Sequence, residues 1–190
     1  MKKIYLFAAV VFLAACNSNT GKPTTENMKA ADSGSAKQEK IIYPYTAEYS
    51  SDFAIGSSKN VQTILEMYKN WDNNKLDNSR NSFAEIDTMY FSDGGIFSGS
   101  RDSLFARANR MREQISSMDN AIQAFVPLRS KDKNEDWVLI WTRETSTDTK
   151  GKKTSRDLHE IWRFDNNGKI NLMYQYEQQL PKMEPPSPKK

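Results

Sequence analysis

The sequence predicts an α+β domain, because helical spacing of apolar residues in its first half gives way to alternation in its second half. Apolar residues three and four positions apart run from Val61 to Trp71, behind the N-cap candidates Ser57 and Ser58. From Ala121 onward, apolar and polar residues alternate, and turn sequences divide the alternating segments. We therefore expect helices packed on an antiparallel meander.

The expected elements follow in chain order from these signals. They are helices over 58–72, 79–87 and 100–115, a short strand over 96–98, and strands over 121–128, 137–145, 156–164 and 169–177. The last two hairpin turns are Asp148-Thr149-Lys150-Gly151 and Asp165-Asn166-Asn167-Gly168, since Asn and Gly tolerate positive φ. On the strand over 137–145, Trp137 and Trp141 share one face, and this pair is more typical of a core than of a ligand platform.

The first sixteen residues have the pattern of an exported lipoprotein. Lys2 and Lys3 precede an apolar run over 4–13 that is too short to span a bilayer. The run ends in Leu13-Ala14-Ala15-Cys16, which resembles the bacterial lipobox, whose cysteine is acylated after cleavage. We expect a signal peptide over 1–15 and lipidation of Cys16, with an ordinary secreted protein cleaved near Ala15 as the alternative.

The flanking segments set the limits of the domain. Residues 17–40 are polar and nearly free of large apolar side chains, so residues 16–40 are expected to be the acylated cysteine and a flexible tether. Residues 181–190 contain four prolines and are expected to be a disordered tail, which leaves a domain over 41–180. Asn17 and Ser18 follow Cys16 with no acidic cluster. By resemblance to lipoprotein sorting, the chain is expected in the bacterial cell envelope, anchored in the outer membrane and facing the periplasm.

Composition excludes several classes of function. Without Lys2 and Lys3, the 27 basic residues become 25 against 24 acidic ones, so nothing indicates nucleic-acid binding. With one cysteine and one histidine, neither a disulfide nor a zinc site is expected. No metal or cofactor is predicted.

Four motifs occur in order between about Ser57 and Tyr176. They are the helix with Val61-Gln62, Tyr68 and Trp71; Asn74-Lys75-Leu76-Asp77; the Asp93-Gly94-Gly95 turn with its strand and Gly99; and Trp162-Arg163-Phe164 leading through the last turn to Lys169-Ile170. This order resembles the nuclear transport factor 2-like (NTF2-like) superfamily, which includes SnoaL-like and ketosteroid isomerase-like proteins. The resemblance implies a conical fold, in which a curved antiparallel sheet wraps around about three helices and leaves an apolar cavity.

The isomerase branch of that superfamily combines a tyrosine, a neutral carboxylic acid and a general-base carboxylate. By resemblance, these positions fall on Tyr68, on Glu160 and on or beside Ser98. No carboxylate lies between Gly94 and Gly99, and a serine without a neighbouring base cannot abstract a carbon-bound proton near neutral pH. The sequence therefore disfavours ketosteroid-type isomerisation and assigns no catalytic residue.

The remaining polar candidates favour structural roles. His159 and Glu160 are adjacent on a strand and face opposite ways, so they form no dyad. Asp87 and Asp93 are candidate catalytic carboxylates, but Asp93 fits the Asx position of its turn. Arginines on the third helix are interleaved with acidic residues and are expected on a solvated surface; they are Arg101, Arg107, Arg110 and Arg112.

Two functions remain open. The first is a noncatalytic module that binds a small apolar or aromatic molecule, or a protein partner such as a second copy through the sheet face. The second is a small isomerase, cyclase or hydratase that uses Tyr68 and Glu160. The candidate cavity residues are Tyr68, Trp71, Ser98, Trp141, Glu160, Met173 and Gln175.

Overall fold

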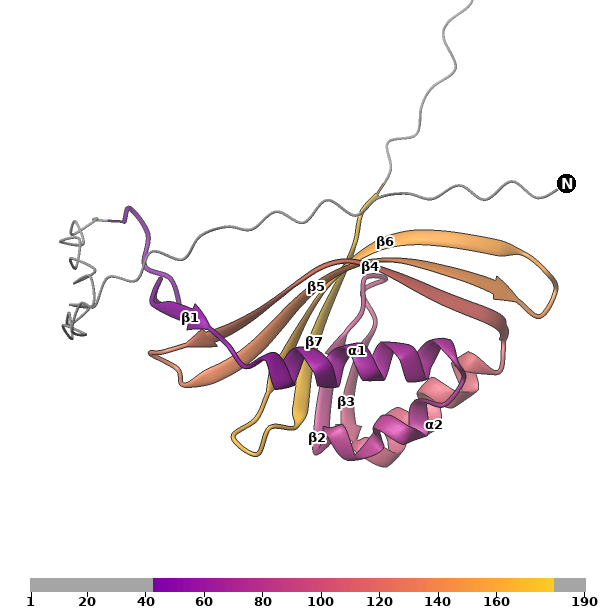
Figure 1. The fold of residues 1–190 in the computed structure, drawn as a ribbon, viewed down its shortest axis with the longest axis horizontal. Helices are drawn as coiled ribbons and strands as arrows, with labels where there is room; N and C mark the ends of the chain where they lie inside the picture. The colour runs from indigo at the N-terminus through magenta and orange to yellow at the C-terminus, as the bar shows by residue number, and fades with distance from the viewer. Residues whose placement is uncertain (1–42, 180–190) are drawn as a thin grey trace, which may run out of the picture. The chain divides into compact units, whose positions relative to one another are not determined.

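A curved seven-stranded sheet carries its helices on the concave side, as the computed structural model shows (Figure 1). The structure describes residues 43–179. The elements are β1 (Phe53–Ile55), α1 (Ser58–Asp72), the 3₁₀ helix η1 (Leu76–Ser82), β2 (Phe83–Tyr90), β3 (Ile96–Ser100), α2 (Arg101–Arg112), β4 (Ile115–Ser130), β5 (Glu135–Asp148), β6 (Lys153–Phe164) and β7 (Ile170–Glu177). The predicted α+β class with three helices and a curved sheet is confirmed. The signal peptide, Cys16, the tether and the tail lie outside the described residues.

The strand order is β1-β4-β5-β6-β7-β2-β3. The predicted meander forms its middle, with β4, β5, β6 and β7 each antiparallel to the next. One pair differs from the expected all-antiparallel sheet, because β2 runs parallel to β7. This pairing brings the end of β2 beside the last strand of the meander, and both contribute to the candidate site below.

The expected helix over 79–87 is wrong. The helical turns end at Ser82, and Phe83 begins strand β2, so Asp87 lies in a strand. The pairing of β2 with β7 is irregular between Phe83 and Thr88. A bulge of this kind breaks the alternation by which a strand is recognised in a sequence.

The strands of the meander are longer than their apolar patterns predicted. β4, β5 and β6 extend beyond the expected ranges at both ends or at one end, into segments rich in Ser, Thr, Asp and Lys. The backbone hydrogen bonds between strands continue in these segments although apolar and polar residues no longer alternate. The sequence pattern therefore predicted strands that are too short. Both predicted hairpin turns are present, and Gly151 and Gly168 have positive φ.

The core lies between α1 and the concave face of the sheet. Val61, Ile64, Met67 and Tyr68 form the buried face of α1. The side chain of Ser57 caps this helix by accepting from the backbone N–H of Lys59, at 3.2 Å. On β5 the face that carries Val138, Ile140 and Thr142 is fully buried. Trp137 and Trp141 on the other face are only half-buried, so the core role expected for this pair is wrong. Within residues 43–179, no helix is both long and apolar enough to cross a membrane.

One charged side chain belongs to the core, contrary to the expected solvated helix surface. Arg112 is only 4% exposed. Its guanidinium donates to the backbone carbonyls of Trp71 and Asp72, both at 3.1 Å, and of Ile115, at 2.5 Å. The expectation for Arg112 is wrong because the last carbonyls of α1 lack helical partners and need donors.

Candidate functional site

The concave side of the sheet, α1 and α2 enclose a cavity of about 230 Å³. Its apolar lining consists mainly of aromatic and methionine side chains: Tyr68, Trp71, Phe83, Phe91, Phe105 and Trp162, together with Met67, Met89, Met111 and Met173. Polar lining residues are Ser92, Asp93, Arg107, Glu144, Arg156, Glu160 and Gln175. The cavity is therefore a mostly apolar pocket with a few polar groups, as is typical of small-molecule sites.

A buried hydrogen-bond cluster centres on Glu160, which projects from β6 and is 6% exposed. Tyr68 of α1 donates its hydroxyl proton to Glu160 Oε2. Trp162 Nε1 donates to the same oxygen at 3.2 Å, and Gln175 Nε2 donates to Oε1 at 2.7 Å. Donors from one helix, α1, and two strands, β6 and β7, therefore hold this carboxyl group in one orientation.

The electrostatics of the cluster follow from burial. Burial raises the pKa of Glu160, and the donors Gln175 and Tyr68 only partly oppose this shift. Burial, with the nearby Glu160 carboxyl, raises the pKa of Tyr68 well above its usual range. Both groups therefore favour their neutral forms.

A second polar group borders the first. Arg156 of β6 donates to Glu144 Oε1 of β5 at 2.8 Å, and its Nη1 lies 3.7 Å from Glu177 Oε2 of β7. Gln175 joins the cavity wall to the end of β2, because its side-chain oxygen accepts from the hydroxyl of Ser92 at 3.2 Å.

The structure brings together five of the seven cavity candidates. Those that line the cavity are Tyr68, Trp71, Glu160, Met173 and Gln175. Ser98 and Trp141 lie elsewhere. Whether the five bind a ligand stays a prediction.

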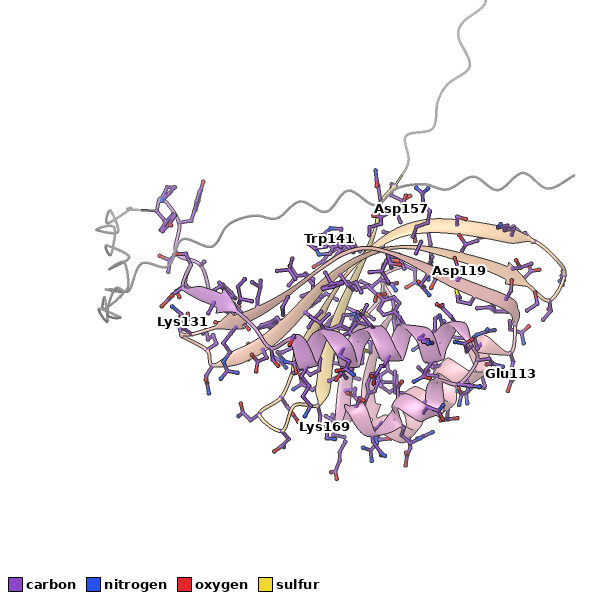
Figure 2. The ribbon with its side chains drawn as sticks, viewed as in Figure 1. Glu113, Asp119, Lys131, Trp141, Asp157 and Lys169 are labelled. Atoms are coloured by element: carbon purple, nitrogen blue, oxygen red, sulfur yellow. The ribbon has the colours of Figure 1, made fainter. Side chains whose placement is uncertain are left out.

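Ser98 and Trp141 belong to the opposite, convex side of the sheet. Ser98 of β3 pairs with Thr88, and their hydroxyl oxygens are 3.2 Å apart. Trp141 stacks on His159 with ring centroids 4.4 Å apart, and Figure 2 shows it on the side away from the helices. His159 thus faces away from buried Glu160, as strand alternation requires.

Several cavity residues were missed from the sequence, among them Phe91, Asp93 and Glu144. Phe91 and Asp93 follow the end of β2, which was taken for part of a helix and a turn. Asp93 does serve the turn, since its Oδ1 accepts from the N–H of Gly95 at 2.8 Å, yet it also lines the cavity. Glu144 continues the buried face of β5 two residues after Thr142, and that alternation was the available signal.

Asp87 is a buried carboxylate apart from the cavity lining. It is fully buried, and neither of its oxygens has a hydrogen-bond partner within residues 43–179. Burial raises its pKa to about 7, against the opposing charge of Arg101. In the same part of the chain, no group of three His, Cys, Asp or Glu side chains is arranged to hold a metal ion.

No family model matches the sequence, and no curated protein matches it. Solved structures do match the fold. An LEH-like epoxide hydrolase of M. tuberculosis is similar with a TM-score of 0.54 and 11% identity, over 64% of this chain and 84% of that chain. An NTF2-like protein of unknown function from Burkholderia pseudomallei is similar with a TM-score of 0.53 and 20% identity, over 64% and 92%. AusH from Aspergillus nidulans has a TM-score of 0.53 and 9% identity, over 67% and 89%.

These likenesses establish the fold: the chain has the NTF2-like fold that its motifs resemble. Because the similar structures include both an epoxide hydrolase and a protein of unknown function, the fold by itself selects no activity. Function has to be argued from the cavity.

Proposed function

We propose that this chain is a lipid-anchored protein of the bacterial cell envelope whose cavity binds a small, mainly apolar molecule. The observation that carries the binding role is the cavity itself, a pocket of about 230 Å³ with aromatic and methionine walls and one buried polar cluster. Methionine side chains adapt to ligand shape, and the polar cluster would fix the orientation of a ligand. The anchoring role rests on the lipobox-like sequence that ends at Cys16.

A cavity-filling variant tests the binding role. Ala108 of α2 lines the cavity, whereas Ala106 on the same helix is exposed. We expect that a panel of small aromatic acids, amines, alcohols and sterols contains compounds that raise the Tm of the purified chain. The same compounds should not stabilise Ala108→Leu but should stabilise the control Ala106→Leu. Equal stabilisation of both variants would place the binding elsewhere and refute the proposal.

A second candidate function is supported by the Tyr68–Glu160 hydrogen bond. A neutral carboxylic acid beside a tyrosine hydroxyl in an apolar pocket is able to donate a proton to a bound substrate. The chain would then be a small isomerase, cyclase or hydratase. Turnover of a cavity ligand that is lost in both Tyr68→Phe and Glu160→Gln would support catalysis, and binding without turnover would support the noncatalytic role.

A homodimer through the convex side of the sheet is the proposed partner interaction. Exposed apolar side chains on β2, β3 and β7 include Ile86, Tyr90, Ile96 and Tyr176. Arg143 and Asp157 form an ion pair at 2.8 Å in which Arg143 is 57% exposed, so two copies related by a two-fold axis could exchange these partners. Light scattering of the purified chain should give the mass of a dimer, and Tyr176→Glu should give that of a monomer.

A further inference from the structure

All the hydrogen-bond partners of Glu160 donate to it. Tyr68 and Trp162 donate to Oε2, and Gln175 donates to Oε1. Trp162 Nε1 is only a donor, and the amide of Gln175 is oriented by Ser92, whose backbone N–H donates to the Gln175 oxygen at 3.4 Å. An ionised carboxylate accepts about four hydrogen bonds. The arrangement therefore fits an anion and leaves one acceptor position, on Oε1.

No guanidinium or ammonium group within residues 43–179 forms an ion pair with Glu160. The charge of Arg156 acts on Glu160 only from a distance, and Arg156 is already shared by Glu144 and Glu177. The second guanidinium of the lining, that of Arg107, lies over the ring of Phe91, 5.4 Å from its centroid. Around Arg156, three carboxyl groups therefore accompany one guanidinium, and burial without a paired countercharge raises the pKa of Glu160.

The walls next to this end are suited to a cation as well as to apolar groups. Tyr68 and Trp162 donate to Glu160 directly. The rest of the aromatic lining consists of Trp71, Phe83, Phe91 and Phe105. Aromatic faces attract ammonium groups, most strongly where water is excluded. The volume of about 230 Å³ lies below the range of about 300–1,000 Å³ that is typical of drug-sized ligands, so a compact ligand is favoured.

We propose that the ligand of the cavity is a small organic amine with an aromatic or similarly apolar body, whose ammonium group donates to the free acceptor position of Glu160. This inference rests on the proposed binding function and narrows its ligand class. The ligand supplies a positive charge in direct contact with Glu160, which no described residue does, and Glu160 releases its proton to solvent when the ammonium binds.

Matched probes test the charge preference. We would measure by calorimetry the binding of 2-phenylethylamine, 2-phenylethanol and 3-phenylpropanoate to the purified chain near neutral pH. A hydrogen bond to a charged group predicts about ten- to hundredfold tighter binding of the amine than of the alcohol. Equal or tighter binding of the alcohol or the acid would overturn the amine proposal and leave the binding function standing. Binding of none of the three would overturn the amine proposal, and the panel with Ala108→Leu would then decide the binding function separately.

Two further measurements locate the effect at Glu160. In the wild-type chain, amine affinity should rise as the pH is raised from about 5 to about 8, because binding releases the Glu160 proton while the amine stays charged. In Glu160→Gln the ratio of amine to alcohol affinity should fall to about one, whereas Glu113→Gln, which changes an exposed carboxylate of α2's end, should keep the wild-type ratio. A flat pH profile in the wild-type chain would refute the proposal even if Glu160→Gln fails to fold.

Discussion

Replacement of Arg112 by methionine should remove a large part of the stability of the domain. Methionine retains much of the aliphatic length of arginine but provides no donors to the carbonyls of Trp71, Asp72 and Ile115. Each hydrogen bond from a charged donor contributes about 1.5 kcal/mol or more, so three contribute about 4–5 kcal/mol. Methionine recovers part of this, because no charge then has to be buried, and we expect a net loss of about 3 kcal/mol.

Urea unfolding followed by tryptophan fluorescence measures this loss. Arg110→Met is the matched control, since Arg110 is exposed on the same helix, and it should change the free energy of unfolding by at most about 0.5 kcal/mol. Arg112→Lys should be intermediate, because an ammonium group reaches fewer of the three carbonyls than the planar guanidinium does. The m-value should stay constant across the series. If Arg112→Met is as stable as Arg110→Met, the carbonyls are satisfied by water and the assigned role of Arg112 is incorrect.

Three other predictions concern Asp87, Gly56 and Cys16. The pKa of Asp87 is about 7 in the folded chain against an ordinary 3.8, so its protonated form is the stabilising one, and stability is lost as the pH rises toward and through 7. This pKa difference corresponds to about 4 kcal/mol of stability. Urea unfolding at several pH values should show that Asp87→Asn removes the pH dependence of the free energy of unfolding and is more stable than the wild type above pH 7. An unchanged pH dependence would contradict the assignment. Gly56→Ala should lower the Tm, because a Cβ there would lie 2.9 Å from backbone atoms of Leu128, with a cost of about 1–3 kcal/mol; a Tm equal to that of the wild type would show that β1 shifts freely. Cys16→Ser should abolish incorporation of labelled palmitate and move the chain from the membrane fraction to the soluble fraction, and a variant that stays with membranes would refute the lipid anchor.

The fold was predictable from the sequence where a helix or strand has one buried face and its apolar residues recur at regular spacing. The spacing along α1 and the alternation along β5 and β6 each report a single buried face, and Asp165-Asn166-Asn167-Gly168 fixes the hairpin between β6 and β7. The resemblance to the superfamily, and not this alternation, placed Glu160, Met173 and Gln175 in the cavity. Strand β2 was lost because it turns a carboxylate, Asp87, inward and an apolar side chain, Ile86, outward, and Ile86 is 63% exposed, so polarity does not report its buried face.

The candidate site was only partly predictable because its members come from segments whose contacts are decided by the whole sheet. The parallel pairing of β2 with β7 brings Ser92 to Gln175 across 83 positions of the chain. No local pattern in either segment reports this pairing. Arg112 was misplaced for a related reason. Two of its three partners are backbone carbonyls of α1, 40 and 41 positions away, and a backbone carbonyl gives no signal in a sequence.

Asp87 and Glu160 are both buried acids, but only Glu160 has the surroundings of a binding site. Asp87 has no hydrogen-bond partner within residues 43–179 and does not line the cavity, so its raised pKa follows mainly from burial. Glu160 is also buried, yet it accepts from Tyr68, Trp162 and Gln175, and it lines the cavity. Three donors aligned on one carboxyl group lower the cost of ionisation there, whereas nothing comparable surrounds Asp87. Binding of a cation should therefore ionise Glu160 and leave Asp87 protonated, so the proton released on amine binding should be lost in Glu160→Gln and kept in Asp87→Asn.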